Sequence, residues 1–238
     1  MKIIDGRIRK HLVFLSAASL LLFSVAPAGA LDWTLSTDLG DANVRGVFAL
    51  DEDNAWAVDE DGGIYHFNGT AWTLETSTGV GHFGVAAGDE NSVFTASAEG
   101  KVFHYDGIWK EMTDFGAYEN YCVSVLESTA MVGNRVGYIY LFHGSDWSRH
   151  TNLDWNEGVN SIFQKTGSGI WAATNHLIDP YSRIYKFESD WIIQTEIAEV
   201  ELNAITVPEA GQARAGGGGT PATGYIYTPS GPDSREET

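Results

Sequence analysis

Cysteine is almost absent from this chain of 238 residues, because Cys122 is the only one. A disulfide needs two cysteines, so no bridge can form within the chain. A fold without disulfides depends on its apolar core, and a chain of this length can bury a large one. The sequence therefore predicts a fold that is stabilised by size and packing.

Basic side chains are also scarce. The chain has 14 Lys and Arg residues against 32 Asp and Glu residues, which gives a formal net charge of −18. A surface this acidic repels phosphate groups, which argues against nucleic acid and anionic lipid as partners. Cations, basic proteins and neutral sugars remain compatible with it.

Long apolar runs are confined to the N-terminus. Four basic residues precede an apolar stretch at 12–25, and Ala28-Gly29-Ala30 matches the small-residue site that signal peptidase cuts. We therefore expect residues 1–30 to be a signal peptide cleaved after Ala30, and the protein to be secreted or periplasmic. Removing its four basic and one acidic side chains would take the net charge from −18 to −21. No cysteine follows the run and the C-terminus carries no hydrophobic tail, so no membrane anchor is expected.

A sustained helical period is missing after residue 30, and a repeated hairpin takes its place. The stretch GGIYHFNGTAW at 62–72 returns as GKVFHYDGIW at 100–109 and GYIYLFHGSDW at 137–147, with weaker copies at 182–191 and from Gly224. The copies recur at a period close to forty residues, because the tryptophans of the hairpins are 39, 37, 38 and 44 residues apart. These tryptophans are Trp33, Trp72, Trp109, Trp147 and Trp191.

Two further columns of equivalent residues run through the copies. The first column contains a small residue in every copy, and the second contains large apolar residues. A residue type that recurs in every copy is explained by packing, so we expect all three columns to be scaffold and Cys122 to be an inert filler of a crowded strand. The small column is Gly46, Gly84, Cys122, Ser161 and Ala204, and the large one is Trp56, Phe94, Met131 and Trp171.

Each copy contains the pattern of four short strands. In the first copy the β-branched and aromatic runs VRGVFAL, AWAV, GIYHF and WTLET alternate with turn residues. Repeats of this length and strand number are typical of β-propeller blades. We therefore predict an all-β protein, a five-bladed β-propeller of four-stranded antiparallel blades over residues 31–229, followed by a disordered tail at 230–238. The fifth copy lacks an outer strand, and residues 31–37 are expected to supply it. A truncated gene that lacks further blades is the alternative.

The pattern of glycine, aromatic hairpin and tryptophan resembles exported bacterial propeller repeats of the photosystem-assembly-factor and sialidase-like kind. The resemblance covers residues 31–229, and it implies the architecture but no particular activity. The Ser-x-Asp portion of the sialidase Asp-box is missing from every copy, and Asp146-Trp147 and Asp190-Trp191 reverse the order of a WD40 signature.

The departures from the repeat indicate where a ligand would bind. The fourth copy inserts residues between its second and third strands, in NHLIDPYS at 175–182, and the fifth does so in RAGGGGTPAT at 214–223. The connections between blades lengthen at 113–121 and 149–158. Both loop classes are expected on one face, around the mouth of the central channel, and loops on a rigid scaffold commonly carry ligand contacts. The candidate ligand-binding residues are Tyr118, Glu119, Asp154, Trp155, His176, Asp179 and Tyr181.

Three functions fit these features. We favour a non-catalytic, monomeric protein-interaction or assembly module that meets a partner outside the cytoplasm through the channel-mouth loops. A carbohydrate-binding module is the alternative, because aromatic rings beside acids and amides suit sugar faces. A small glycoside hydrolase would need Glu119, Asp154 and Asp179 to converge. No metal or other cofactor is expected, because His66 and His104 recur in neighbouring copies without a carboxylate at ligand spacing.

Overall fold

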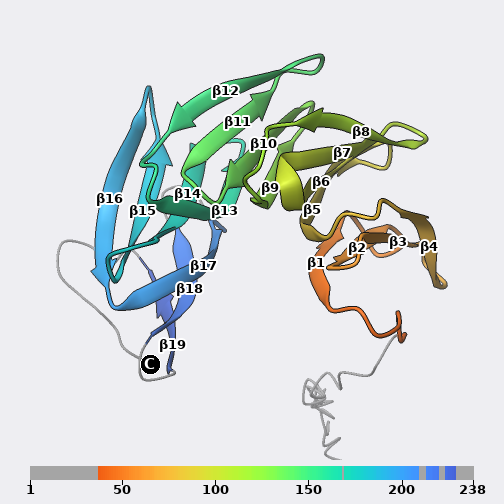
Figure 1. Cartoon of the computed structure of the whole chain (residues 1–238), viewed down its shortest axis with the longest axis horizontal. Helices are drawn as coiled ribbons and strands as arrows, with labels where there is room; N and C mark the ends of the chain where they lie inside the picture. Colours follow the sequence, from red (N-terminus) through yellow and green to blue (C-terminus); the bar gives the residue numbers. More distant parts are fainter. Residues whose placement is uncertain (1–36, 168, 209–212, 220–222, 229–238) are drawn as a thin grey trace, which may run out of the picture. The chain divides into compact units, whose positions relative to one another are not determined.

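The computed structural model describes residues 37–167, 169–208, 213–219 and 223–228 (Figure 1). Within these residues the regular structure is β-strand, apart from a 3-10 turn at Ala98–Gly100, and no helix is long and apolar enough to cross a membrane. The strands form five antiparallel sheets, four of them with four strands and the last with three. The strands of the first two sheets are β1 (Val44–Ala49), β2 (Ala55–Asp59), β3 (Gly63–Phe67), β4 (Trp72–Ser77), β5 (His82–Asp89), β6 (Ser92–Ser97), β7 (Lys101–Tyr105) and β8 (Trp109–Asp114). The remaining strands are β9 (Asn120–Leu126), β10 (Thr129–Asn134), β11 (Tyr138–Phe142), β12 (Trp147–Asn152), β13 (Glu157–Lys165), β14 (Gly169–His176), β15 (Tyr181–Phe187), β16 (Trp191–Ala198), β17 (Val200–Thr206), β18 (Arg214–Gly219) and β19 (Thr223–Tyr227).

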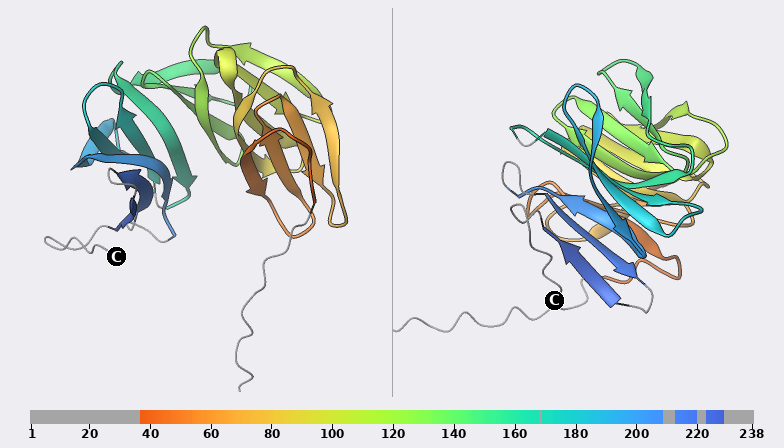
Figure 2. Two further views of the ribbon diagram at one scale, coloured as in Figure 1. Left: turned by 60° about the horizontal axis from the view of Figure 1, so that its bottom comes forward. Right: turned by 90° about the vertical axis from the view of Figure 1, so that its left-hand side faces the viewer.

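The predicted all-β class and the order of four antiparallel strands per copy are confirmed. In every sheet the strands pair in chain order, and the first strand of each sheet contacts the first strand of the next, from β1 to β17 (Figures 1 and 2). The fifth sheet has three strands among the described residues. The predicted closing strand lies outside these residues except for Thr37, which is not in a strand. The predicted signal peptide and C-terminal tail also lie outside them.

One loop prediction is wrong. The glycine-rich stretch RAGGGG was expected to connect two strands, but it is itself strand β18, paired with β17 on one side and β19 on the other. The glycines permit this pairing because a Cβ on Gly217 would overlap the carbonyl oxygen of Glu201, and one on Gly219 would lie 2.8 Å from that of Glu199. Their lack of a side chain therefore allows a close approach between neighbouring backbones.

Small residues bring the first strands of neighbouring sheets together, as the column predicted. A Cβ on Gly46 would lie 3.1 Å from the Cα of Gly84, so a side chain at Gly46 would push the first two sheets apart. In the third sheet Cys122 fills this position, and its thiol donates a hydrogen bond to the carbonyl oxygen of Val159, 3.3 Å away. Burial raises the pKa of Cys122 to about 12, which keeps the thiol protonated and unreactive at neutral pH.

The core is divided into four apolar clusters, each formed by two consecutive sheets. One buried residue of the large apolar column lies in each cluster: Trp56, Phe94, Met131 and Trp171. Both faces of an inner sheet are therefore buried, which explains why a strand such as KVFHY of β7 carries apolar side chains on both alternations.

The tryptophans that begin the fourth strands pack against the preceding sheet. The indole N–H of Trp109 donates to the carboxylate of Glu75 on β4, at 2.7 Å. The Trp147 ring lies edge-on to Phe94 of the second sheet, and Trp191 lies edge-on to His150 of the third. The structural interpretation of this column is confirmed for these three tryptophans.

Two classes of loop share one face of the sheets, as predicted. These are the hairpins between second and third strands and the connections from each sheet to the next. Backbone hydrogen bonds join each hairpin to the connection that follows its sheet: Thr78 N–H to Gly62 O (2.9 Å), Phe115 N–H to Gly100 O (2.9 Å) and Leu153 N–H to Gly137 O (3.0 Å). We call the surface formed by the hairpins at 59–63, 97–101, 134–138 and 176–181, and the connections at 78–81, 115–119, 153–156 and 199, the connection face.

A glycine pair tests how tightly these loops pack. Gly137 and Gly144 both have positive φ, at +82° and +88°, but a Cβ on Gly137 would overlap the Asp154 carbonyl, whereas one on Gly144 would meet nothing within 4 Å. Gly144→Ala is expected to lower the free energy of unfolding by about 1 kcal/mol, from backbone strain alone. Gly137→Ala should cost about 2 kcal/mol more, because the loops must also separate. Urea denaturation measures both, and equal losses would contradict the close packing.

Candidate binding site

The fourth sheet has the longest hairpin on the connection face. β14 and β15 extend beyond their counterparts and are joined by residues 177–180. The hairpin is fastened on both sides, because the Leu177 N–H donates to Asn156 O and the Glu199 N–H donates to Pro180 O, each at 2.6 Å. The insertion predicted from the sequence is thus part of an anchored hairpin.

A cavity of about 750 Å³ lies between this hairpin and the fifth sheet. Its lining comes from the ends of β14 and β15 on one side and from the beginning of β17 and the end of β18 on the other. The lining residues are Asn175, His176, Asp179, Pro180, Tyr181, Ser182, Glu199, Val200, Glu201, Asn203, Gly218 and Gly219.

Hydrogen bonds fix the floor of the cavity. The side-chain oxygen of Asn175 accepts from the Leu202 N–H at 2.6 Å and from the Ser182 hydroxyl at 2.7 Å. The same hydroxyl also lies within hydrogen-bond reach of the Val200 carbonyl oxygen. Polar side chains of the fourth sheet therefore hold the first strand of the fifth sheet by its backbone.

His176 lies in the wall of the cavity with only 5% of its side chain exposed. Its Nδ1 accepts a hydrogen bond from the backbone N–H of Asp179 at 2.8 Å and a weaker one from Ile178 at 3.4 Å. An imidazole nitrogen that accepts carries no proton, so the proton of the neutral ring resides on Nε2. The ring stacks on Tyr181, with 4.4 Å between centroids.

A buried carboxylate supports this wall from behind. Glu157, at the start of β13, is fully buried and accepts hydrogen bonds from Thr174 (2.8 Å), Tyr185 (2.9 Å) and the guanidinium of Arg183. Burial and the nearby Glu157 raise the pKa of Tyr185 above its usual value, so the phenol remains a hydrogen-bond donor.

Arg183 connects this buried network to the cavity. Its guanidinium carbon lies 4.6 Å from the centre of the Tyr181 ring, and its Nε donates to Glu196 at 2.9 Å. Because Tyr181 contacts both Arg183 and His176, its ring is held in place before any ligand arrives. Preorganised side chains lose less conformational entropy on binding.

The structure brings together three of the seven predicted residues, since His176, Asp179 and Tyr181 all line the cavity. Asp154 and Trp155 lie in the adjoining connection at 153–156, where the Asp154 carboxylate accepts from the Asn156 N–H.

The other two predicted residues lie one sheet farther along the connection face and do not line the cavity. They belong to the connection at 115–119, where the Glu119 carboxylate pairs with Arg135 of the neighbouring hairpin at 3.6 Å and Tyr118 is exposed.

The three carboxylates that a hydrolase would use have separate partners. Glu119 pairs with Arg135, Asp154 caps its own turn, and Asp179 lies beside His176. Among the described residues no hydrogen bond joins any two of these carboxylates, and no group of three or more His, Cys, Asp or Glu side chains could hold a metal ion. The repeated histidines serve in packing, because His66 stacks on Trp56 and His104 on Phe94. Glu75 does lie 3.2 Å from His66 Nδ1, a carboxylate that the spacing in the sequence did not reveal.

Sequence reasoning predicted Trp155 but missed two exposed aliphatic residues on the loop joined to it. Trp155, Leu177 and Ile178 are 66%, 46% and 71% exposed, and the hydrogen bond from Leu177 to Asn156 ties their two loops together. We call these three residues the apolar trio. Leu177 and Ile178 could have been found, because they are aliphatic residues inserted into a loop without a counterpart in the other copies.

Sequence reasoning also missed the acidic and supporting residues of the site. Glu157 and Arg183 form the support behind Tyr181, and Glu199, Glu201 and Asn203 line the cavity. A signal existed for Arg183, which takes the place of a glycine in the first copy. For the residues of β17 no sequence signal existed, because only the three-dimensional arrangement of two sheets brings them to the hairpin.

No protein-family model matches the sequence, and no curated protein matches it either. Several solved structures are similar to the chain. The chain is similar to YCF48 from Cyanidioschyzon merolae, with 11% identity and a TM-score of 0.58 over 77% of this chain and 67% of that one. A structure of YCF48 bound to D1 peptide gives 14% identity and a TM-score of 0.54 over 76% and 64%. The WD40 β-propeller domain of Doa1 gives 12% identity and a TM-score of 0.53 over 74% and 62%.

At such identities the likeness shows the fold alone, which is that of a β-propeller. It supports the predicted resemblance to propeller repeats at the level of architecture. The chain spans about two thirds or less of the length of these structures.

The network behind Tyr181 can be tested by comparing the loss of Arg183 with the loss of its exposed partner, Glu196. Arg183→Met leaves Glu157 buried without its cation and is expected to lower the free energy of unfolding by about 3 kcal/mol. Glu196→Gln removes the exposed partner and should cost less than about 1 kcal/mol. The double variant Glu157→Gln with Arg183→Met should recover part of the loss. Similar small losses in both single variants, measured by urea denaturation, would show that Glu157 does not need Arg183.

Proposed function

We propose that this protein is an exported, non-catalytic β-propeller that binds a segment of a protein partner through the connection face of its fourth sheet. The observation that carries the proposal is the apolar trio. Trp155, Leu177 and Ile178 are large and exposed, they lie on two loops that a backbone hydrogen bond joins, and Leu177 and Ile178 follow the cavity residue His176 in the chain. Exposed apolar groups with a polar surround commonly mark surfaces that bind other proteins.

The composition of the trio favours a protein over a sugar. Sugar sites place flat aromatic faces beside hydrogen-bonding groups, and Trp155 alone would suit that role. Leu177 and Ile178 offer only aliphatic surface, which is stabilised by burial against another apolar side chain. The similar structure of YCF48 bound to D1 peptide supports this choice, because it shows that a protein of this architecture can bind a peptide.

We also propose that the propeller has five blades and that residues 31–37 complete the last one. Val47 is 68% exposed, although its equivalents Val85, Ile162 and Ile205 are buried by the preceding sheet. Ile226 on β19 is exposed in the same way, whereas its equivalents on β3, β7 and β11 are buried. Closure of the fifth blade onto the first would cover both residues, and DWTLST at 32–37 repeats the outer-strand sequence WTLETS of β4.

A pair of isoleucines tests the binding surface. Ile178 and Ile108 are both exposed, but Ile108 lies in the hairpin between β7 and β8, away from the connection face. The full-length chain, recovered as the cell exports it and checked by mass spectrometry for an N-terminus at Leu31, is screened on an array of end-blocked dodecapeptides and on a glycan array. We expect peptide binding that Trp155→Ala and Ile178→Ala each weaken about tenfold or more, and that Ile108→Ala leaves unchanged.

Three outcomes would contradict parts of this proposal. If glycans bind and only Trp155→Ala reduces their binding, the protein is a carbohydrate-binding module. If peptides bind equally well to all three variants, the partner uses another surface. Retention of residues 1–30 in the recovered protein would contradict export.

Closure is tested by a substitution at Val47. If the ring is closed, Val47→Asp places an unpaired carboxylate between two sheets and should lower the free energy of unfolding by about 2–3 kcal/mol. If that face is open to water, the change should stay within about 0.5 kcal/mol, as for an ordinary surface residue. Ile108→Asp, at another exposed apolar site, is the control, and equal effects at both positions would reject closure.

A further inference from the structure

We infer that the cavity beside His176 receives an arginine side chain of the bound segment. This inference rests on the proposed function, because it names the group that the partner would insert next to the apolar trio. Three features of the cavity support it: the charge of its lining, a free donor in its wall and the fact that its carboxylates do not converge on a metal site.

The charged residues of the lining are acidic, and they come from three parts of the chain. Asp179 projects from the hairpin, Glu199 lies in the connection to the fifth sheet, and Glu201 lies on β17. Among the described residues that line the cavity there is no Lys or Arg, and the nearby Arg183 is already paired with Glu157 and Glu196. A cationic group would therefore be attracted into the cavity, and an anionic group would be repelled.

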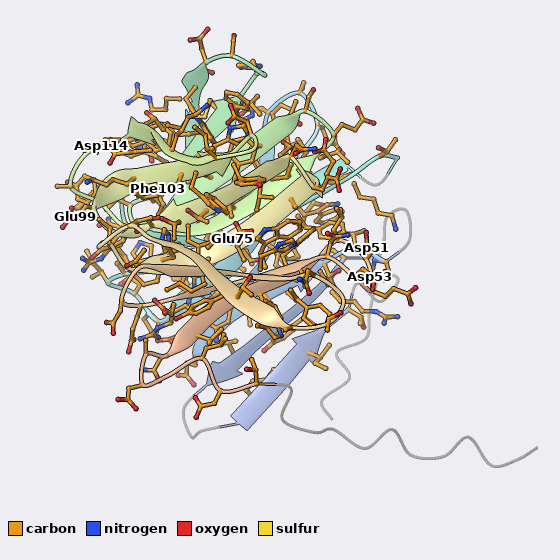
Figure 3. All side chains as sticks on the ribbon, turned by 90° about the vertical axis from the view of Figure 1, so that its right-hand side faces the viewer. Asp51, Asp53, Glu75, Glu99, Phe103 and Asp114 are labelled. Atoms are coloured by element: carbon orange, nitrogen blue, oxygen red, sulfur yellow. The ribbon has the colours of Figure 1, made fainter. Side chains whose placement is uncertain are left out.

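Acidic residues alone would not single out this place, because they are spread over the molecule. Figure 3 shows Asp51 and Asp53 at the opposite end of the strands from Glu99 and Asp114, so both loop faces carry carboxylates. The acidic lining at this place is distinctive because it borders a half-open cavity whose walls are held by hydrogen bonds.

The second feature is the imidazole of His176. With Nδ1 accepting two backbone N–H groups, Nε2 bears the proton, and it makes no hydrogen bond to any described residue. The ring is 95% buried and belongs to the cavity wall, so the cavity is where this donor can find an acceptor. A backbone carbonyl of an inserted peptide segment would satisfy it, which a free metal ion or ammonium ion could not do.

The third feature is the spacing of the carboxylates. No three acidic or histidine side chains in the described part of the chain approach closely enough to share a metal ion. Separated acceptors suit a group whose donors are also separated. The planar guanidinium of arginine presents five N–H donors in different directions, whereas the ammonium of lysine concentrates its charge at one point.

The position of Glu199 adds a useful control. Its backbone φ angle is +59°, and its N–H donates a hydrogen bond to the carbonyl oxygen of Pro180. Glu99 and Glu127 adopt the same left-handed conformation elsewhere, so the conformation itself is not special to the cavity. Glu127 lies in the turn between β9 and β10, away from the cavity. Replacing it by glutamine removes one negative charge, as Glu201→Gln does, but leaves the cavity unchanged.

The inference is tested with the full-length chain and the peptides that bind it on the dodecapeptide array. Each bound sequence is resynthesised with its arginine replaced by citrulline, which keeps the shape and removes the charge. We expect bound sequences to carry an arginine close to an apolar residue, and citrulline to weaken binding about tenfold or more. Asp179→Asn and Glu201→Gln, both at exposed carboxylates, should weaken binding similarly, whereas Glu127→Gln should not.

The outcomes separate this inference from the proposed function. Peptides that need Trp155 and Ile178 but bind equally well with citrulline would overturn the arginine site and leave the apolar surface in place. The same conclusion follows if Glu127→Gln weakens binding as much as Glu201→Gln, since the effect would then be one of overall charge. The absence of binding by any peptide would remove both the proposed function and the arginine site.

Discussion

The burial of apolar side chains between consecutive sheets is the constraint on which the rest of the structure depends. A four-stranded sheet of forty residues cannot form a core alone, and here each apolar cluster is shared by two consecutive sheets. Small residues on the first strands let the sheets approach, and large ones on the second strands fill the space between them. Because consecutive sheets support each other, the loops of an inner sheet are held from both sides.

This support explains why one enlarged hairpin can form an ordered site. The hairpin of the fourth sheet is fastened to the connection before it and to the residue after it, and its base is joined to β17 by Asn175 and Ser182. Behind it, a buried ionic network reaches from Glu157 through Arg183 to Tyr181. The network has a cost in desolvation, which its several hydrogen bonds offset. Its effect is to fix an aromatic wall at the edge of a cavity.

The fold could be predicted well from the sequence because each sheet corresponds to one sequence repeat. Periodic tryptophans, small residues and turn signals are local features that recur, and the strand positions follow from them. The glycine-rich β18 was mistaken for a loop, because glycine is typical of both a turn and a close backbone approach, and only the pairing with Glu201 distinguishes them. At the site, His176, Asp179 and Tyr181 were predictable as departures from the repeat. Glu199 and Glu201 were not, because nothing in their own copy marks them, and they join the site only through contact between two sheets.

The single cysteine has a consequence for the reaction of the protein with oxidants. Oxidants and other thiols react with a thiolate that they can reach, and Cys122 is buried, protonated and hydrogen-bonded to a neighbouring strand. Two molecules therefore cannot become covalently joined through this residue while their sheets stay packed. The fraction of disulfide-linked dimers in an aged preparation would accordingly measure how often the third and fourth sheets separate and expose Cys122.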